Sequence, residues 1–283
     1  MDAVYSKFDE RQIMLNNTLE VYHYKDPYFK APDFHSHDFY EFYFFIDGCV
    51  TYHIEESVYD LVPGDVLIIP PGELHRPVIV EQNSVYERIV LWINRETVIR
   101  CIGDNTDFTK LLLERFQSKN HLLHFETDDF KNKCNLLNSM IAFQNSKEPE
   151  DRLLQLPYLS ILLITLYKSG KNNFSEPSKP ENIISKIILY INENIDKDIK
   201  LDFLSEQFFI SKYHLIRTFK AYTNTTIGQY ITSKRITKTK FYLQHGYNLL
   251  ESSQKSGFNN YSNFYKAFIK ETGISPNIYK KLK

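Results

Sequence analysis

The chain has 283 residues, of which 42% are hydrophobic and 24% are charged, and its formal net charge is -1. This length suits two domains of ordinary size, and the composition excludes a disordered chain. No apolar run reaches membrane-spanning length, and the amino terminus MDAVYSKFDERQ carries charges where a signal peptide needs its apolar segment, so we expect a cytoplasmic protein without membrane contact.

Residues 39–93 have the pattern of short β-strands. β-branched and aromatic runs recur there, and turn residues such as Asp47-Gly48 and Pro63-Gly64 separate them. The runs are YEFYFFI, VTYHI, VLIIP and YERIVLWI. Several short strands at this spacing predict a small antiparallel barrel or sandwich.

From about residue 107 the pattern becomes helical. Apolar residues take helical spacing in FTKLLLERF, in FKNKCNLLNSMIAF and in the long run from Leu153 to Tyr167. The last run is apolar around most of its circumference, so it must bury more than one face. It is either an internal helix or a contact with a second copy of the chain, and we favour the contact, which predicts a homodimer.

Residues 168–182, KSGKNNFSEPSKPEN, have no periodic apolar positions and are rich in proline, glycine and small polar residues, as a linker is. Helical spacing resumes directly afterwards, with isoleucines from Ile183 to Ile191. We therefore expect a first domain over residues 1–167, a linker over 168–182 and a helical domain over 183–283.

The helical domain is basic. Residues 180–283 hold 16 Lys and Arg against 8 Asp and Glu, a net charge of +8, whereas residues 1–179 carry a net charge of -9. This asymmetry indicates a polyanion-binding domain joined to something else, and nucleic acid is the commonest such polyanion.

The basic domain also contains a weak duplication at an offset of 49 residues. Its matched pairs are Leu215 with Phe264, Phe219 with Phe268, Thr223 with Thr272 and Tyr230 with Tyr279. Each copy reads as a short helix, a tight turn and a second helix. We expect Ser211 to cap the second helix of the first copy and Asn259 to cap the second helix of the second copy. This is the plan of a helix-turn-helix, whose second helix enters the major groove of DNA.

The second helix of each copy therefore predicts which residues face DNA. The first copy would present Lys212, Tyr213, His214, Ile216, Arg217 and Lys220, and the second Tyr261, Ser262, Asn263 and Lys266. Arg217 suits guanine, Asn263 suits adenine, and Lys212 and Lys220 suit phosphates. The alternative is that these residues are only the solvated faces of two surface helices.

The stretch LDFLSEQFFISKYHLIRTFKAYTNTTIGQYITSKRI, followed by SGFNNYSNFYKAFIKETGISPNIYK, resembles the DNA-binding domain of AraC-type (AraC/XylS family) transcription regulators. The resemblance covers roughly the last 100 residues. It implies two helix-turn-helix units, joined by a long helix around Ile231 to Leu243, that read successive major grooves on one face of DNA. One departure is Phe209, which occupies a turn position where the family usually has a small residue.

The family resemblance extends to residues 35–42, HSHDFYEF, because many members carry a cupin-like sensor barrel before the DNA-binding domain. The cupin pattern fits at His35, His37, Glu41 and Gly48, and again at Gly64, Pro70, Gly72 and His75. Inward side chains alternate along strands, so His35, His37, Glu41 and His75 could converge inside a barrel. Such a set suits a divalent metal: iron, manganese, nickel or zinc.

Three readings of this cluster stay open: a metal site, a ligand site without metal, and purely structural histidines. For the ligand site we expect an effector such as a carbohydrate to contact a larger set, since sugars stack on aromatic rings and hydrogen-bond at their edges. That set is His35, His37, Glu41, Tyr43, His75, Arg88 and Trp92.

The sequence thus predicts a two-domain α+β protein, with an N-terminal cupin-like β-barrel followed by helices and a C-terminal all-α domain containing two helix-turn-helix units. We interpret it as a transcription regulator that binds promoter DNA, responds to a small effector and acts with RNA polymerase, most often as an activator. The first rival is a metal-dependent cupin enzyme with a helical appendage. The second is a constitutive DNA-binding protein whose barrel only dimerises.

Overall fold

The computed structural model describes residues 5–8, 11, 13–81, 84–102, 120–169, 182–244 and 246–281. By its internal contacts the chain divides into one unit of Met1–Pro32 with Ser36–Lys179, and a second unit of Pro180–Lys283 with Asp33–His35. The helix predicted in FTKLLLERF and most of the predicted linker lie outside the described residues.

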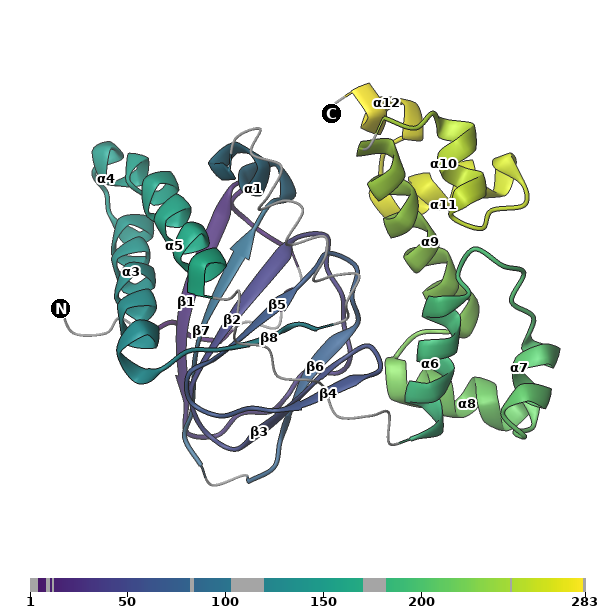
Figure 1. Ribbon diagram of the computed structural model, residues 1–283, viewed down its shortest axis with the longest axis horizontal. Helices are drawn as coiled ribbons and strands as arrows, with labels where there is room; N and C mark the ends of the chain where they lie inside the picture. The colour runs from purple at the N-terminus through teal and green to yellow at the C-terminus, as the bar shows by residue number, and fades with distance from the viewer. Residues whose placement is uncertain are drawn as a thin grey trace. The chain divides into compact units, whose positions relative to one another are not determined.

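The first unit contains two antiparallel sheets (Figure 1). The larger sheet has the strand order β1-β7-β2-β5-β8, and the smaller has the order β4-β3-β6. The strands are β1 (Leu19–Asp26), β2 (Tyr40–Asp47), β3 (Val50–Ile54), β4 (Ser57–Asp60), β5 (Asp65–Ile69), β6 (His75–Ile79), β7 (Tyr86–Ile93) and β8 (Leu122–His124). The two sheets enclose an aromatic core, in agreement with the small antiparallel barrel or sandwich that the turn-separated runs predicted.

Strand β2 shows why the central strands are apolar at nearly every position. Phe42 and Phe44 belong to the core under the helices, whereas Tyr43 and Phe45 belong to the core between the sheets. Successive side chains of a strand point to opposite faces, so both faces of this sheet are covered. Both faces of the larger sheet are therefore shielded from water.

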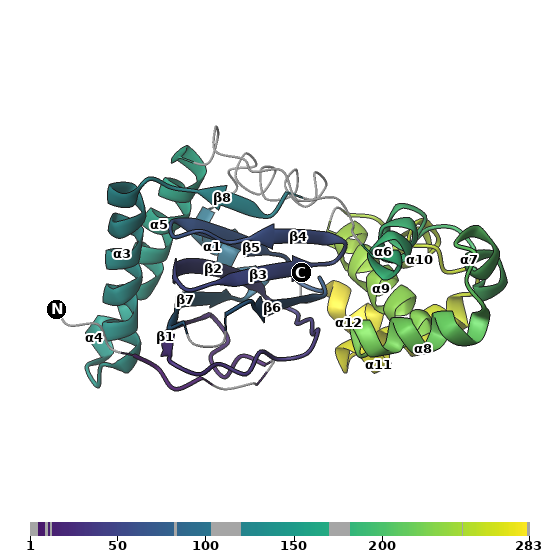
Figure 2. The ribbon, with the colours of Figure 1, turned by 90° about the horizontal axis from the view of Figure 1, so that it is seen from below.

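Helices cover the outer face of the larger sheet. They are α1 (Arg95–Ile102), α3 (Thr127–Asn145) and α5 (Gln155–Ser169), whereas the short α4 (Pro149–Leu153) buries no residue and lies mainly against α3 and α5. Figure 2 shows α3 beside the sheet with its axis across the strands, and Leu137 and Met140 of α3 and Leu162 of α5 join one core with the sheet. The helix predicted over Leu153 to Tyr167 is confirmed in α5, which begins two residues later.

The sequence runs missed four strands: β1, β4, β6 and β8. β1 alternates Leu19 and Val21 with Glu20, and β8 is only three residues long, so neither forms an apolar run. β6 contains Pro77, which removes a backbone donor; the strand tolerates it because β6 is at the edge of the smaller sheet.

The second unit is helical. Its helices are α6 (Ile183–Glu193), α7 (Leu201–Gln207), α8 (Lys212–Thr223), α9 (Ile227–Gln244), α10 (Leu249–Lys255), α11 (Tyr261–Thr272) and α12 (Pro276–Lys281). In Figure 1 the long helix α9 lies between the α6–α8 and α10–α12 groups, and it contacts α8, α10 and α11. This confirms the expected plan of two short-helix pairs joined by a long helix.

Helices α8 and α11 match residue for residue at the offset of 49, from Lys212 and Tyr261 at their starts to Thr223 and Thr272 at their ends. In both helices the last threonine donates its hydroxyl hydrogen bond to a phenylalanine carbonyl four residues back, at 2.7 Å. The duplication in the sequence is therefore a duplication of structure.

The helix caps confirm one prediction and correct another. Ser211 accepts a hydrogen bond from the backbone N–H of His214, as expected of the residue before α8. The prediction of Asn259 for α11 is wrong by one residue, because the side chain of Asn260 accepts from the backbone N–H of Asn263 at 3.0 Å. Asn260 is also the residue that the offset of 49 from Ser211 selects.

Candidate functional sites

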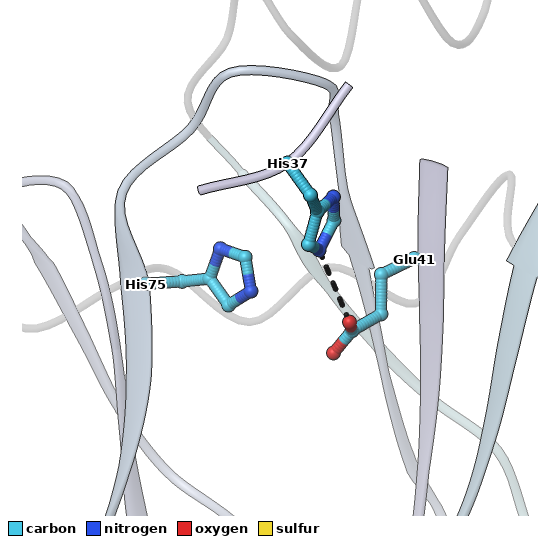
Figure 3. Close-up of side chains that lie close together, drawn as sticks. All are labelled: His37, Glu41 and His75. Carbon is cyan, nitrogen blue, oxygen red and sulfur yellow. Dashed lines mark hydrogen bonds and ion pairs between the residues drawn. The ribbon is translucent and has the colours of Figure 1, made fainter. Parts of the chain in front are cut away.

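The structure brings His37, Glu41 and His75 together on the inner face of the first unit (Figure 3). His37 precedes β2, Glu41 lies on β2 and His75 begins β6 of the other sheet, so the cluster bridges the two sheets. All three are buried, and one ligand atom of each lies within 4.8 Å of the others. The two sequence patterns therefore meet in space although 34 residues separate Glu41 from His75.

The two histidines are oriented by backbone carbonyls. Nδ1 of His37 is 3.0 Å from the carbonyl oxygen of Phe39, and Nδ1 of His75 is 2.8 Å from that of Glu73. A carbonyl oxygen only accepts hydrogen bonds, so Nδ1 carries the proton in each ring. Nε2 of His37 then faces Glu41 at 3.2 Å, where it either donates as an imidazolium or offers its lone pair to a metal.

The Glu41 carboxylate is surrounded by donors. Nε1 of Trp92 donates to one oxygen at 2.8 Å, and the hydroxyl of Tyr52 donates to the other at 3.3 Å. Burial, followed by the nearby Glu41 carboxylate, raises the pKa of the Tyr52 hydroxyl well above its ordinary value, so Tyr52 remains a neutral donor. A negative charge at Glu41 is therefore supported by a donor from β7 of its own sheet and by a donor from β3 of the other sheet.

The residue types of this cluster fit a divalent metal, because two imidazole nitrogens and a carboxylate are common ligands of iron, manganese, nickel and zinc. His35, the fourth predicted ligand, is not in the cluster. Its Nδ1 contacts the carbonyl of Asp33 at 2.9 Å, and Asp33–His35 group with the second unit. The structure thus supplies three of the four predicted ligands.

Arg88, on the same face, lies in a box of aromatic rings. Its guanidinium carbon is 4.1 Å from the ring centre of Tyr86, 4.4 Å from that of Phe29 and 4.8 Å from that of Tyr24. Nη1 forms an ion pair with Asp26, and within the described residues Nη2 has no hydrogen-bond partner. Cation–π contacts and one carboxylate therefore stabilise a fully buried charge.

Tyr43 is also buried on the inner face, and its hydroxyl has no hydrogen-bond partner in the part of the chain that the structure describes. Its ring lies 4.9 Å from that of Tyr52, which contacts Glu41. The predicted residues Tyr43, Arg88 and Trp92 thus all lie on the inner face, between the sheets.

Sequence reasoning missed the partners that the amino-terminal segment supplies. Phe8 packs edge-on against Phe29, at 4.8 Å between ring centres, and Arg11 pairs with Glu20 at 2.9 Å. The guanidinium of Arg11 also lies 5.2 Å from the Trp92 ring. The alternation of β1 could have indicated Glu20, but no local pattern points to Phe8 or Arg11.

In the second unit all predicted DNA-facing residues of α8 are exposed, while Leu215 and Phe219 are fully buried. Lys212 forms an ion pair with Asp202 of α7. On α11, Phe264 and Phe268 are buried, and the predicted residues are exposed. Those exposed residues of α11 are Tyr261, Ser262, Asn263 and Lys266.

The turns before α8 and α11 share one backbone geometry. Phe209 has a φ of 52° and Gly257 a φ of 90°, both in the left-handed region. The backbone N–H of Ile210 donates to Ser205 at 3.0 Å, and that of Phe258 donates to Ser253 at 3.0 Å. These bonds hold the short helix and the second helix of each pair at a fixed angle.

Arg235 has a structural position on α9. Its Nε donates to the carbonyl of Ile195 at 2.9 Å, and Nη2 donates to that of Lys197 at 2.6 Å. The side chain therefore ties α9 to the segment between α6 and α7. Across the described ranges no helix is long and apolar enough to cross a membrane.

Two family models match the chain. Residues 16–98 match an AraC-like ligand binding domain, and residues 204–282 match a helix-turn-helix domain.

Individual relatives match over most of their length. The HTH-type transcriptional regulator YbfI of Bacillus subtilis is 25% identical over 247 residues, which cover 86% of this chain and 85% of that protein. The HTH-type transcriptional activator RhaR of Salmonella schwarzengrund is 24% identical over 259 residues, which cover 88% of this chain and 86% of that protein. Among solved structures, unsaturated fatty acid-bound ToxT of Vibrio cholerae is 14% identical and covers 94% of this chain and 95% of its own, with a TM-score of 0.38.

Proposed function

Since this chain belongs to the AraC-type family of transcription regulators, with a ligand-binding domain ahead of a helix-turn-helix domain, we propose that α8 and α11 read promoter DNA under the control of an effector bound between the sheets. The protein is a DNA-binding regulator and not an enzyme. It matches a helix-turn-helix domain and an AraC-like ligand binding domain, and its relatives YbfI and RhaR are transcriptional regulators. The rival of a metal-dependent cupin enzyme is set aside on these grounds.

The observation that carries the proposal is the matched pair of helices in the second unit. Both begin at an asparagine or serine cap, bury two apolar residues at the same positions and expose their leading residues. Two surface helices with unrelated roles would not be expected to begin and end at matching positions, to share the same type of cap and to bury the same positions. The net charge of +8 over residues 180–283 suits the phosphate backbone that such helices must approach.

We assign base contact in the first helix to Arg217, whose fork suits guanine, and phosphate contact to Lys220. Lys212 would exchange its ion pair with Asp202 for a phosphate on binding. In the second helix Asn263 suits adenine, and Lys266 occupies the position of Arg217 at the offset of 49.

For the effector we propose a small polar molecule, such as a carbohydrate, that contacts the inner face around His37, Glu41, Tyr43, His75, Arg88 and Trp92. The support is a buried face that combines aromatic rings with a carboxylate, a guanidinium and an unsatisfied tyrosine hydroxyl. Binding would shift the population of arrangements that let both helices reach DNA, by as much as the effector prefers one arrangement.

This effector proposal is tested by the emission of Trp92, the only tryptophan of the chain, whose N–H donates to Glu41. A library of sugars and metabolites is screened for a change in emission, and hits are tested for altered DNA binding. A hit that shifts emission without altering DNA affinity would favour the constitutive regulator.

A second candidate for the same cluster is a divalent metal, and the two Nδ1–carbonyl contacts favour it. His37, Glu41 and His75 would hold the ion, which would supply a Lewis-acidic centre for effector oxygens when bound. We expect added Zn²⁺ or Mn²⁺ to raise the unfolding temperature of the wild-type chain by several degrees and to change Trp92 emission.

His75→Ala should abolish both effects of the ion, whereas His53→Ala, which removes a histidine outside the cluster, should preserve them. Calorimetry and elemental analysis of the purified protein provide the measurement. Equal responses of the two variants would assign ion binding to another place.

We further propose that α5 forms a homodimer contact. Leu154, just before α5, and Ile161 and Ile164 on it are exposed, at spacings of seven and three residues, while Leu162 and Leu163 pack inward. Exposed apolar residues at this spacing form a stripe along one face of a helix, and two helices can pack together along such stripes. Acting on a promoter as an activator would add a contact with RNA polymerase in the cytoplasm.

The double variant Ile161→Lys, Ile164→Lys is expected to be monomeric at concentrations where the wild type is dimeric, because two charges cannot be buried unpaired in a helix contact. Light scattering after size exclusion measures the mass. Leu250→Lys changes an exposed apolar residue of α10 and should leave the mass unchanged. A dimeric double variant would move the contact away from α5.

A further inference from the structure

Phe209, in the turn before α8, is a phenyl ring in an unfavourable place. Its side chain is 97% exposed, and its φ of 52° lies in the left-handed region that residues with a Cβ rarely adopt. Neither the exposed ring nor this backbone conformation stabilises the folded chain. A residue that costs stability and contacts nothing in its own fold points to a contact made elsewhere.

The turn itself does not need this side chain. The matching position in the second unit is Gly257, which adopts the same left-handed region and forms the same pair of turn hydrogen bonds. There, a Cβ would lie 2.4 Å from the carbonyl oxygen of Ile195, so only glycine fits. At Phe209 the side chain projects into open solvent, so glycine would serve the turn there and the ring requires another explanation.

The place of Phe209 relative to α8 supplies that explanation. It precedes the cap Ser211 by two residues and therefore lies at the leading end of α8, which is the end that enters the major groove. Tyr213 and Ile216 follow on α8 and are 75% and 43% exposed. We call Phe209, Tyr213 and Ile216 the apolar strip.

Cations accompany the apolar strip along the same helix. Lys212, Arg217 and Lys220 are exposed within the nine residues that follow the cap. A protein partner would have to cover these three charges, whereas a duplex pairs the two lysines with phosphates and Arg217 with a guanine while other bases meet the strip. Charge complementarity therefore favours DNA as the occupant.

We propose that the apolar strip packs against thymine 5-methyl groups in the major groove, so that α8 selects thymines beside the base read by Arg217. This inference rests on the proposed role of α8 as a DNA-reading helix. The thymine methyl is the one apolar group that base pairs present in the major groove, so it is the natural counterpart of exposed apolar side chains. Phe209 would thereby add a specificity contact that the second turn, with its glycine, lacks.

The test uses the full-length chain and a duplex selected by it from a random library. Each thymine of the selected site is replaced in turn by deoxyuridine, which removes only the methyl group. We expect the affinity to fall about fourfold at each thymine that meets the strip, which is the effect of about one buried methyl. We expect Phe209→Gly to lower the affinity about tenfold and to lose the response to deoxyuridine at one position.

Folding is controlled within the same experiment. Phe209→Gly should unfold at the same or a higher temperature than the wild type, because glycine adopts a positive φ without strain. Leu250→Ala, which removes an exposed apolar side chain of α10, should bind the selected duplex and its deoxyuridine forms like the wild type.

The outcomes separate this inference from the role of α8. If the library yields no selected duplex, the DNA-reading role fails first. If the chain selects a duplex but neither deoxyuridine nor Phe209→Gly changes its affinity, the thymine contact is refuted and the DNA-reading role stands. If Phe209→Gly keeps full DNA affinity but loses transcription activation in a purified system, the strip belongs to RNA polymerase and the inference is wrong.

Discussion

Replacing Arg217 by alanine is expected to weaken specific DNA binding by about 1 to 3 kcal/mol and to relax selectivity at one base pair, because a bidentate arginine–guanine contact is lost. Arg217 is exposed on α8, one turn beyond the exposed Tyr213, while Leu215 and Phe219 fix the helix from beneath. Fluorescence anisotropy on the selected duplex and on a scrambled duplex measures both affinities.

Two companion variants separate base reading from charge. Arg217→Lys keeps the positive charge but loses the planar fork, so it should restore affinity for the scrambled duplex and not the selectivity. Lys220→Ala should weaken both duplexes alike and lower the slope of log affinity against log salt by about 1. Retained selectivity in Arg217→Ala would remove this residue from the base-reading surface.

Gly257→Ala is expected to destabilise the second unit by about 3 kcal/mol or more, because a methyl group at a positive φ meets a rigid backbone atom there. The new Cβ would lie 2.4 Å from the carbonyl oxygen of Ile195 and 2.8 Å from Nε of Arg235. Relief would require moving the segment that Arg235 holds by its two hydrogen bonds to backbone carbonyls.

The matched control is Gly273→Ala. Gly273 follows α11 with a φ of 74°, but nothing lies within 4 Å of an added Cβ, so only the backbone cost of about 1 kcal/mol remains. Urea unfolding followed by circular dichroism at 222 nm reports the helical second unit, and Trp92 emission reports the first unit independently. If both variants lose the same free energy of unfolding, the backbone at Ile195 moves away from the added methyl group without an energetic cost.

The spacing of apolar residues in the sequence predicted the strands that are buried on both faces and the helices that bury one continuous apolar stripe. Strands β2, β5 and β7 were visible because apolar residues occupy adjacent positions in them, and β3 was visible as a short alternating run of β-branched and aromatic residues. Helices α8 and α11 were visible because the chain repeats itself. β1 was missed because a strand with Glu20 at its second position does not look apolar; the carboxylate is nevertheless buried and pairs with Arg11 of the amino-terminal segment.

The sequence predicted that histidines and a glutamate form a cluster, but it could not predict which histidines belong to it. His35 and His37 are equivalent in a local motif, yet only His37 meets Glu41 and His75. The choice depends on β6, which pairs with β3 in the other sheet and places His75 opposite Ile54. Likewise, nothing near Arg88 in the chain announces Asp26, whose place follows from the pairing of β1 with β7.

Helix α9 has a consequence for the architecture of the operator. Its 18 residues form a strut of about 27 Å, and both reading pairs attach to it. Because the length of α9 is constant, it would fix the distance between the two half-sites that the two helix pairs contact. One inserted base pair would rotate one half-site relative to the other by about 35° around the duplex axis, so we expect the promoters that this protein binds to keep a constant half-site spacing even where individual bases vary.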